Sequence, residues 1–241
     1  MMRRRNAPCT SSEGPHPINA PLKIQETPWD ARALGTNTYE ITSLSEDVLK
    51  KIGSMAGHFT VRVDPLCSTK LLHEYGFYYC DTLIEPYCSL DKFTAFADPS
   101  VSVSRNVAEK ELQAMAHGAF AHGRFHRDFQ VDNDLADLRY DLWLQDLFNA
   151  GSVLGLMYHY ELAGFFGLNE NRIVLNAVGE KHQGQGLAKY LWSAACANLF
   201  QSGYGEITSS ISAANVAILN VYSALGFGFR NPLDMYHRFN K

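Results

Sequence analysis

Hydrophobic residues recur along this chain with two different periods, which predict where helices and strands lie. Spacings of three and four residues favour amphipathic helices, and we expect these over residues 45–52, 68–75, 105–120, 134–148, 186–200 and 215–225. Alternating or continuous runs rich in aromatic and β-branched residues favour strands, and we expect these over residues 38–41, 58–63, 77–86, 153–160, 163–168, 172–179, 206–212 and 235–239. This order predicts an α/β fold with a mixed sheet, rather than a barrel or a helix bundle.

The pattern divides the chain into three expected regions. Residues 1–20 start with basic residues but have no apolar run after them, so we interpret them as a flexible tail. Pro99 and the serines near it interrupt the pattern further along. We therefore expect a small N-terminal domain over residues 21–98 and a larger domain over residues 105–241.

One stretch of the N-terminal region is repeated in the C-terminal region. Residues 72–79 and 222–229 both read as the end of a helix, a Gly-Phe pair and the start of a strand. One interpretation is a common glycine helix end followed by a core aromatic residue. The other is that the N-terminal part is a shrunken relative of the C-terminal fold. The sequence leaves both open.

Composition and charge narrow the class of protein. Of the 241 residues, 46% are hydrophobic and 19% are charged, which supports a real core and argues against global disorder. The net charge of −4 gives no reason to expect a broad nucleic-acid-binding face. No apolar run approaches the roughly 18 residues that a membrane span needs. We therefore expect neither a nucleic-acid partner nor a membrane.

The cysteines and histidines show no metal-binding pattern. The five cysteines include no C-x-x-C pair, and their odd number argues against a zinc ribbon or a secreted disulfide framework. We therefore expect a cytoplasmic protein. His122 and His126 are four residues apart, but no H-E-x-x-H pattern surrounds them, so we expect no metal.

The clearest chemical signal is a glycine-rich turn between an apolar strand and a long helix, over residues 178–188. Such a turn presents free N–H groups at the positive end of a helix, which suits a phosphate. Gly184 and Gly186 let the backbone approach the ligand without a Cβ atom. A Rossmann fingerprint does not fit, because Lys189 stands at the third glycine position, and the Gly-Lys-Ser/Thr of a P-loop is absent. A tight turn without a ligand is the alternative.

A second motif follows the turn and completes a family pattern. Asn215, Tyr222 and Leu225-Gly226-Phe227 read as N-x-x-x-x-x-x-Y-x-x-L-G-F. With the Q-x-x-G-x-A pattern of residues 183–188, this motif resembles the Gcn5-related N-acetyltransferases (GNAT) over residues 105–241, including the order of elements. The resemblance implies a GNAT fold and an acyltransferase that uses acetyl-CoA as co-substrate.

The resemblance also assigns roles by position. The pyrophosphate of acetyl-CoA would bind main-chain amides of Gln183, Gly184, Gln185, Gly186, Leu187, Ala188 and Lys189. The pantetheine arm would pair with the strand edge at Asn176, Ala177 and Val178, where neighbouring strands splay apart, and Asn215 would help to hold the coenzyme. Tyr222 would stand near the thioester sulfur as general acid, because a phenol is a neutral proton donor near pH 7. Its alternative role is that of a core aromatic residue.

Two other segments resemble a narrower family. Gly123-Arg124-Phe125-His126-Arg127-Asp128, followed by a helix with Tyr140 and Trp143, is similar to the S-R-F-H-x-D … L-Y-x-x-W signature of TDP-fucosamine acetyltransferases. The segment Trp29-Asp30 … Gly35 is similar to their W-D/E-x-x-F-G opening. Gly123 and Leu34 depart from the usual Ser and Phe. This resemblance implies acetylation of the amine of a TDP-4-amino-4,6-dideoxygalactose type of nucleotide sugar for surface polysaccharide. Arg124, His126 and Asp128 would then bind that substrate.

Several alternatives stay open at this level. The acceptor could be another small amine or a protein N-terminus, and a catalytically inactive CoA-binding sensor is a third possibility. The resemblance is compatible with a homodimer. The general base is not defined by the sequence, and its candidates are Asp128, His126, His159 and Glu161.

Overall fold

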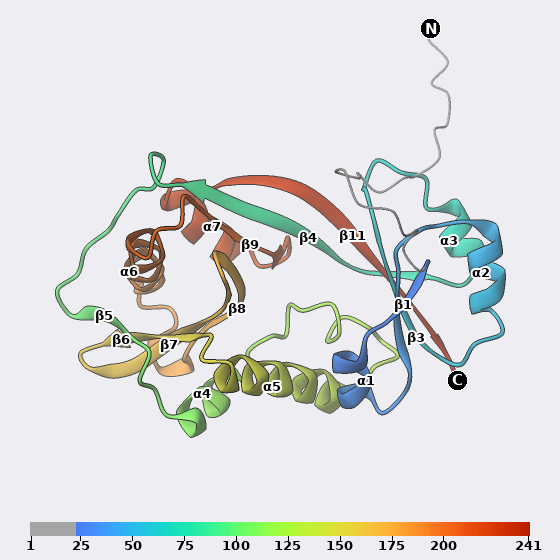
Figure 1. Ribbon diagram of the computed structural model, residues 1–241, viewed down its shortest axis with the longest axis horizontal. Helices are drawn as coiled ribbons and strands as arrows, with labels where there is room; N and C mark the ends of the chain where they lie inside the picture. The colour runs from blue at the N-terminus through green and yellow to red at the C-terminus, as the bar shows by residue number, and fades with distance from the viewer. Residues whose placement is uncertain (1–22) are drawn as a thin grey trace, which may run out of the picture.

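The computed structural model describes residues 23–241, and these residues build one mixed sheet of eleven strands with helices packed on both of its faces (Figure 1). The helices are α1 (Pro28–Leu34), α2 (Glu46–Ile52), α3 (Lys70–Glu74), α4 (Glu109–Ala116), α5 (Asn133–Asn149), α6 (Ala188–Gln201) and α7 (Val216–Ala224). The strands are β1 (Ile24–Glu26), β2 (Thr38–Ile41), β3 (Gly57–Val63), β4 (Tyr78–Ser89), β5 (Val101–Ser104), β6 (Val153–Tyr158), β7 (Glu161–Asn169), β8 (Arg172–Val178), β9 (Glu206–Ser209), β10 (Ile211–Ser212) and β11 (Gly228–Asn240). The mixed sheet confirms the predicted fold class, whereas the expected tail, residues 1–20, lies outside the described residues.

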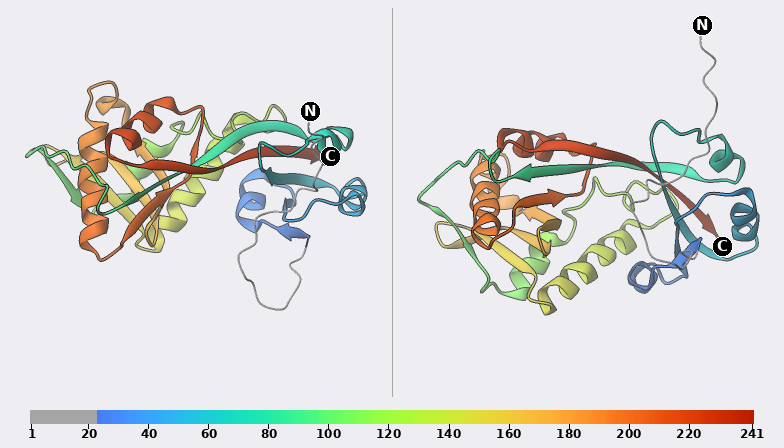
Figure 2. Two further views of the ribbon diagram at one scale, coloured as in Figure 1. Left: turned by 90° about the horizontal axis from the view of Figure 1, so that it is seen from above. Right: turned by 45° about the horizontal axis from the view of Figure 1, so that its top comes forward.

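The strand order explains the elongated shape of the molecule. Hydrogen-bonded neighbours follow the order β1-β2-β3-β11-β4-β9-β8-β7-β6-β5, and β10 pairs with β4. The long strands β4 and β11 are antiparallel to one another and run from the larger lobe to the smaller one (Figures 1 and 2). The two predicted regions of the chain therefore share one continuous sheet.

Each half of the sheet contains the same succession of elements. In the N-terminal half, β2, α2, β3, α3 and β4 follow one another, and β2 is parallel to β3. In the C-terminal half, β8, α6, β9, α7 and β11 follow one another, and β8 is parallel to β9. β3 pairs with β11 from the other half, and β9 pairs with β4 in the same antiparallel way. The two halves thus complete each other by exchanging a strand.

The turns that lead into the exchanged strands have the same geometry. Gly76 and Gly226 both have a left-handed backbone, with φ of 74° and 85°. The N–H of Phe77 donates to the carbonyl of Leu72 at 2.9 Å, and the N–H of Phe227 donates to that of Tyr222 at 3.0 Å. Together with the matching strand pairing, these turns favour the interpretation that the N-terminal half is a reduced copy of the C-terminal fold.

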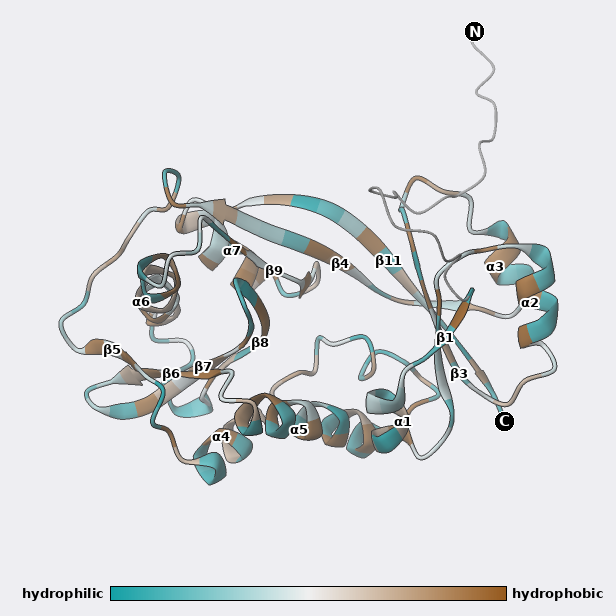
Figure 3. Cartoon of the chain, in the orientation of Figure 1, coloured by the Kyte–Doolittle hydropathy of each residue, from teal (hydrophilic) through white to brown (hydrophobic). Residues whose placement is uncertain are grey.

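Side-chain burial follows the predicted amphipathic patterns. Hydrophobic and hydrophilic residues alternate along α2 and α5, which bury one face each (Figure 3). Trp192 of α6 packs edge-on against Phe166 of β7 in the largest apolar cluster, and Leu144 of α5 lies in a second cluster on the other face. The N-terminal half has a cluster of its own around Phe59. No helix in the part that the structure describes combines the length and the apolar character needed to cross a membrane.

Several expected boundaries differ from the structure for local reasons. β11 begins at Gly228, well before the expected start, because a β-bulge between Arg230 and Leu233 absorbs the Asn231-Pro232 turn signal, with Asn231 at a φ of 52°. The strand expected over residues 206–212 is divided into β9 and β10, which is significant for the site. Helix α1 and strands β1 and β5 were not predicted.

The cysteines also differ from expectation. Cys80, Cys88 and Cys196 are buried free thiols, whereas Cys67 takes part in a disulfide bond.

Candidate active site

The candidate site lies where the parallel strands β8 and β9 separate. They are paired only at Arg172–Thr208 and Ile173–Ser209. Beyond Ile173, strand β8 keeps its antiparallel partner β7, but among residues 23–241 no strand pairs with it on the β9 side. Asn176, Ala177 and Val178, the residues expected to pair with a pantetheine arm, lie in this one-sided part. The edge has main-chain hydrogen-bonding groups that an extended, amide-containing ligand can pair with.

The glycine turn follows directly from this open edge and begins helix α6. Gly184 and Gly186 have φ values of 71° and 73°, as a left-handed turn requires, and a Cβ at either position has no atom within 4 Å. The side chains of Gln183 and Gln185 brace the turn by donating to the carbonyls of Val178 and Lys181, at 2.8 and 2.7 Å. These two side chains are thus engaged within the loop. The N–H of Gln183, expected to bind the pyrophosphate, is engaged as well, because it donates to the carbonyl of Glu180 at 3.1 Å.

The main-chain amides of this turn form an anion cradle. Within residues 23–241, the N–H groups of Gly184, Gln185, Gly186, Leu187, Ala188 and Lys189 donate no hydrogen bond. They precede or open a 14-residue helix, whose dipole adds positive potential at the same place. The chain therefore fits a pyrophosphate at the position that the sequence predicts for it.

Tyr222 lies on α7 and is fully buried, with 0% of its surface exposed. Its phenol Oη and the indole Nε1 of Trp192 are both buried without a hydrogen-bond partner. Both residues belong to the apolar cluster that contains Ile173, the last β8 residue paired with β9. Burial raises the pKa of Tyr222 well above its usual range, so the phenol is protonated at physiological pH. Ser209 and Trp192 lie near the hydroxyl and lower its pKa by less than burial raises it, but neither makes a hydrogen bond of ordinary geometry with it within residues 23–241.

The other predicted coenzyme residues have structural roles as well. Asn215 is the N-cap of α7, and its side-chain oxygen accepts from the N–H of Ile218 at 3.3 Å. Its side-chain amide nitrogen makes no hydrogen bond in the described part of the chain. Lys189 places its ammonium over the rings of Phe96 and Tyr190, at 5.2 and 4.9 Å from their centroids.

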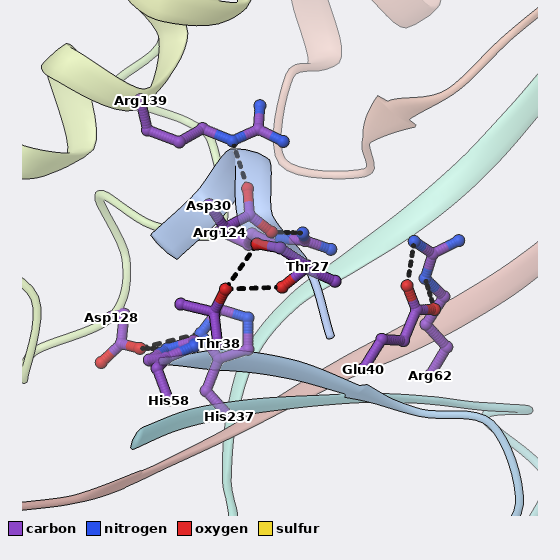
Figure 4. A network of polar contacts seen from close by, with 10 residues as sticks. All are labelled: Thr27, Asp30, Thr38, Glu40, His58, Arg62, Arg124, Asp128, Arg139 and His237. Carbon is purple, nitrogen blue, oxygen red and sulfur yellow. Dashed lines mark hydrogen bonds and ion pairs between the residues drawn. The ribbon is translucent and has the colours of Figure 1, made fainter. Parts of the chain in front are cut away.

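The segment between α4 and α5 is held by buried ion pairs rather than exposed to solvent. Asp30 of α1 accepts from Arg139 of α5 at 2.8 Å and lies 3.9 Å from Arg124 (Figure 4). Only 14% of the Arg124 side chain is exposed. His126 is 2.9 Å from Asp137 and is also largely buried. The three segments that carry the narrower resemblance thus meet at Asp30, and Arg124 and His126 both have an acidic side chain beside them within the chain.

Asp128 joins the two halves of the molecule. Its Oδ2 accepts from His58 Nε2 of β3 at 2.9 Å and from His237 Nδ1 of β11 at 2.8 Å (Figure 4). Its Oδ1 accepts from the hydroxyl of Tyr78 and from the N–H of Gln130, at 2.8 and 2.9 Å. The carboxylate is fully buried, and every one of these contacts is a hydrogen bond of ordinary length.

The hydrogen bonds around Asp128 and its burial determine the pKa values of Asp128 and His237. Burial tends to raise the pKa of Asp128, but the hydrogen bonds from His237 and His58 outweigh burial and hold the pKa well below its usual range. Burial lowers the pKa of His237 to about 3, so its imidazole is neutral at physiological pH. An ionised carboxylate with all of its donors in place is a structural link, and it is poorly suited to take a proton during turnover.

The remaining candidate bases are also engaged or exposed. Glu161 pairs with Lys181 at the surface, and the charge of Lys181 lowers the pKa of Glu161. His159 lies in the tight turn after β6 with a φ of 48°. The sequence analysis missed Asp81 of β4, a fully buried acid beside Arg127 and Ser212. Its signal in the sequence is an acid within an otherwise weakly polar strand.

Comparisons with known proteins agree with this geometry. The sequence profile of the acetyltransferase (GNAT) family matches residues 118–227. No curated protein sequence shows significant similarity to the chain.

Similar folds occur among solved structures. A GCN5-related N-acetyltransferase from Sphaerobacter thermophilus has a TM-score of 0.61 at 12% identity, over 90% of this chain and 76% of its own. One from Kribbella flavida has a TM-score of 0.54 at 9% identity, over 85% of this chain and 82% of its own. A tandem GNAT protein from the clavulanic acid biosynthesis pathway has a TM-score of 0.52 at 11% identity, over 85% of this chain and 76% of its own.

The open edge between β8 and β9 and the anion cradle both lie within residues 118–227, the segment that the GNAT acetyltransferase profile matches. The protein is an acyltransferase with acetyl-CoA as its co-substrate.

Proposed function

We propose that this protein transfers the acetyl group of acetyl-CoA to the amine of a nucleotide-linked amino sugar, with Tyr222 as the general acid for the CoA thiolate. The observation that carries the transfer is the one-sided strand edge at Asn176, Ala177 and Val178, which leads into the free amides of the glycine turn. In this proposal the edge pairs with the pantetheine arm, the amides hold the pyrophosphate, and Asn215 contributes to the same site.

The role of Tyr222 rests on its lack of a partner. A buried hydroxyl without a hydrogen bond costs free energy, so such groups are rare unless a ligand satisfies them. The phenol of Tyr222 meets this description, and its raised pKa keeps the proton in place until the C–S bond breaks. The thiolate is a stronger base than the neutral thioester sulfur, so the phenol stabilises the transition state more than the ground state.

The acceptor class is supported by the resemblance to TDP-fucosamine acetyltransferases and by a pocket at the meeting point of the segments that carry it. Trp29 of α1 and Trp143 of α5 line a pocket of about 410 Å³ together with Arg32 and Arg139. Flat indole rings suit a nucleobase, and guanidinium groups suit a diphosphate. In this proposal Arg124, His126 and Asp128 contribute to substrate binding chiefly by fixing the position of the segment that carries Arg127.

Calorimetry and a turnover assay test the proposal in sequence. Acetyl-CoA should bind wild type and Tyr222→Phe with equal, micromolar affinity, since only the phenol is removed. Thiol release should then be followed with TDP-4-amino-4,6-dideoxygalactose, with spermidine and with a short peptide that has a free N-terminus. Turnover of the nucleotide sugar alone supports the proposed acceptor.

Other results of the same assays correct the proposal. Turnover of the polyamine or the peptide instead replaces the acceptor and keeps the transfer reaction. Binding without any turnover favours a CoA-binding sensor.

A further inference from the structure

Asp81 is a buried carboxylate with one oxygen that has no partner. The residue lies near the start of β4 and has 0% of its surface exposed. Its Oδ1 accepts from Arg127 Nη1, from the hydroxyl of Ser212 at 2.8 Å and from the N–H of Thr82 at 2.9 Å. Its Oδ2 is buried and makes no hydrogen bond with any residue in the described part of the chain. A carboxylate oxygen can accept two hydrogen bonds, and a buried one without any is costly unless a ligand supplies the donor.

Asp81 lies close to the segment that joins β9 to α7, the helix that carries the proposed general acid. Ser212, which donates to Asp81, follows Ser209, the last β9 residue paired with β8, by three positions. Three extended residues span at most about 10 Å. The same segment then continues to Asn215 and into the helix that carries Tyr222. Asp81 therefore lies next to the connection between the open strand edge and the proposed general acid.

Other acids near this part of the sheet already have their partners. Glu85, also on β4, accepts from Arg230 Nε at 2.6 Å and lies 3.6 Å from Arg172. Both oxygens of Asp128 are used by the donors that join the two halves. Asp81 differs from Glu85 and Asp128 because one of its oxygens is unused. Arg127, which covers Asp81 from the α4–α5 segment, has 33% of its side chain exposed, so only one partly exposed side chain separates Asp81 from the surface on this side.

We propose that Asp81 Oδ2 receives the ammonium group of the acceptor and takes one proton from it. This inference rests on the proposed acetyl transfer and adds the missing base. The ammonium gives a proton to Asp81, and the free amine attacks the thioester carbonyl. The C–N bond forms, the C–S bond breaks, and the thiolate takes a proton from Tyr222. The nitrogen loses its second proton to solvent, which restores the phenol, and Asp81 releases its proton to solvent.

The surroundings of Asp81 are consistent with this role. Burial raises the pKa of Asp81, while the hydrogen bond from Ser212 and the charges of Arg127 and Arg124 act in the opposite direction. Cys80 of the same strand and Tyr140 of α5 are the other titratable groups that it influences, and Asp234 of β11 is joined to the cluster through Thr82. A base with a raised pKa is better matched to an ammonium than an ordinary carboxylate.

The test compares Asp81→Asn with Asp234→Asn. Asp234 is a matched control because it is an acid on the neighbouring strand that accepts from Thr82 at 2.6 Å, outside the proposed contact with the amine. The assay measures thiol release with TDP-4-amino-4,6-dideoxygalactose, spermidine and the peptide as acceptors. We expect Asp81→Asn to lower kcat/KM by about 100-fold or more with unchanged acetyl-CoA affinity by calorimetry. Asp234→Asn should stay within about threefold of wild type.

A pH profile separates catalysis from structure and does not depend on Asp81→Asn folding. The acidic limb of kcat/KM should report Asp81, because the base works only when it is deprotonated. Ser212→Ala removes a hydrogen bond that lowers the pKa of Asp81, so the acidic limb should move to higher pH. Asp234→Asn should leave the limb in place.

Each remaining outcome overturns a defined part of the inference. A loss of less than tenfold in Asp81→Asn, or an acidic limb that is unmoved in Ser212→Ala, removes Asp81 from the reaction and leaves the transfer intact. Acetyl-CoA binding with no acceptor turned over by wild type removes the proposed function and the role of Asp81 together.

Discussion

The two halves of this protein have the same order of elements, and the site occurs in only one of them. In the N-terminal half, β2 pairs with β3 along all of its length, from Thr38–His58 to Ile41–Val61. In the C-terminal half, β8 leaves β9 after two residue pairs. The succession of strand, helix, strand, helix and strand is therefore not sufficient for a coenzyme site. The site requires that the parallel pair opens.

The connections that follow β2 and β8 also differ between the two halves. β2 reaches α2 through residues 42–45, and Ser45 caps the helix by accepting from the N–H of Val48 at 3.4 Å. β8 reaches α6 through residues 179–187, which contain the glycine turn, and no side chain caps that helix. Ser45 bonds to an N–H group at the start of α2, whereas the N–H groups at the start of α6 stay available to a ligand. The helix with a side-chain cap thus lies in the half that has no coenzyme site.

The residue at position 222 is a third difference between the two halves. Leu72 occupies the equivalent place in the N-terminal half, where its carbonyl accepts from Phe77 as that of Tyr222 accepts from Phe227. Both side chains are buried, with 2% and 0% of their surface exposed. Since a leucine packs at this turn, packing alone does not explain a phenol with an unpartnered hydroxyl.

The largest effect that tests this comparison is expected from Tyr222→Phe. We expect kcat to fall by about 100-fold or more, because general acid catalysis is removed. Acetyl-CoA affinity should be unchanged, and the free energy of unfolding should stay the same or rise, because the variant removes a buried hydroxyl that makes no hydrogen bond of ordinary geometry. Steady-state kinetics and urea unfolding measure the two quantities. Tyr236→Phe, in the core of the N-terminal half, is the control, and an equal loss of kcat there would contradict the assignment.

The link between the halves should give the next largest effect. Asp128→Asn replaces an oxygen that accepts from two histidines with a donor or a neutral acceptor. Breaking such a buried cluster costs about 3 kcal/mol of unfolding free energy, and urea unfolding should show one cooperative transition for both halves. Asp132→Asn is the matched control, since asparagine caps α5 as well as aspartate does. Two separate transitions in wild type would show that the halves fold independently.

A pair of glycine substitutions should give a smaller effect that isolates the ligand. Gly186 and Gly76 have φ values of 73° and 74°, and neither has an atom within 4 Å of a Cβ position. Alanine at either position therefore costs about 1 kcal/mol of backbone strain. We expect Gly186→Ala to weaken acetyl-CoA binding about tenfold or more by calorimetry, because the added Cβ faces the phosphates. Equal affinities for Gly186→Ala and Gly76→Ala would mean that the turn does not contact the coenzyme.

The most gradual expected effect is the pH dependence that His237 introduces where the two halves join, because it is spread over several pH units. Its pKa is lowered from 6.5 to about 3 in the folded protein, so between these values the unfolded chain binds a proton that the folded chain does not. Stability is therefore full above pH 6.5 and falls as the pH decreases, by up to about 1.4 kcal/mol per pH unit. Urea unfolding at pH 7, 6, 5 and 4 should show this slope, and His237→Asn should flatten it. An unchanged slope in that variant would assign the effect to other groups.

Much of the C-terminal half could be predicted because its signals are local. The glycine turn was predicted from residues 178–188, and Gly184 and Gly186 have the left-handed backbone that the interpretation required. Helix α7 begins after Asn215, as its capping side chain indicates. These features depend on residues that are close in sequence, so spacing and residue type are sufficient to predict them.

The features that could not be predicted join residues that are distant in sequence. The pairing of Gly57 with Asn240 and the cluster of His58, Asp128 and His237 exist only after the two halves exchange strands. Arg124 was expected beside a substrate phosphate, yet the structure gives it Asp30, an ion pair that no spacing reveals. Asp81 was missed for the same reason, because its burial and its unused oxygen depend on β10 and Arg127.

The shared sheet has a consequence for synthesis of the chain. The strand that completes the N-terminal half, Gly228–Asn240, pairs with Gly57–Val63 and is made long after it. Domains usually fold as they leave the ribosome, N-terminal part first, but here the first half lacks a strand until residues 234–240 have emerged. Pairings so distant in sequence also form slowly. The unfinished edges of β3 and β4 must therefore stay exposed until a segment that is translated much later has emerged, and nascent chains are most vulnerable to aggregation and chaperone capture in that interval.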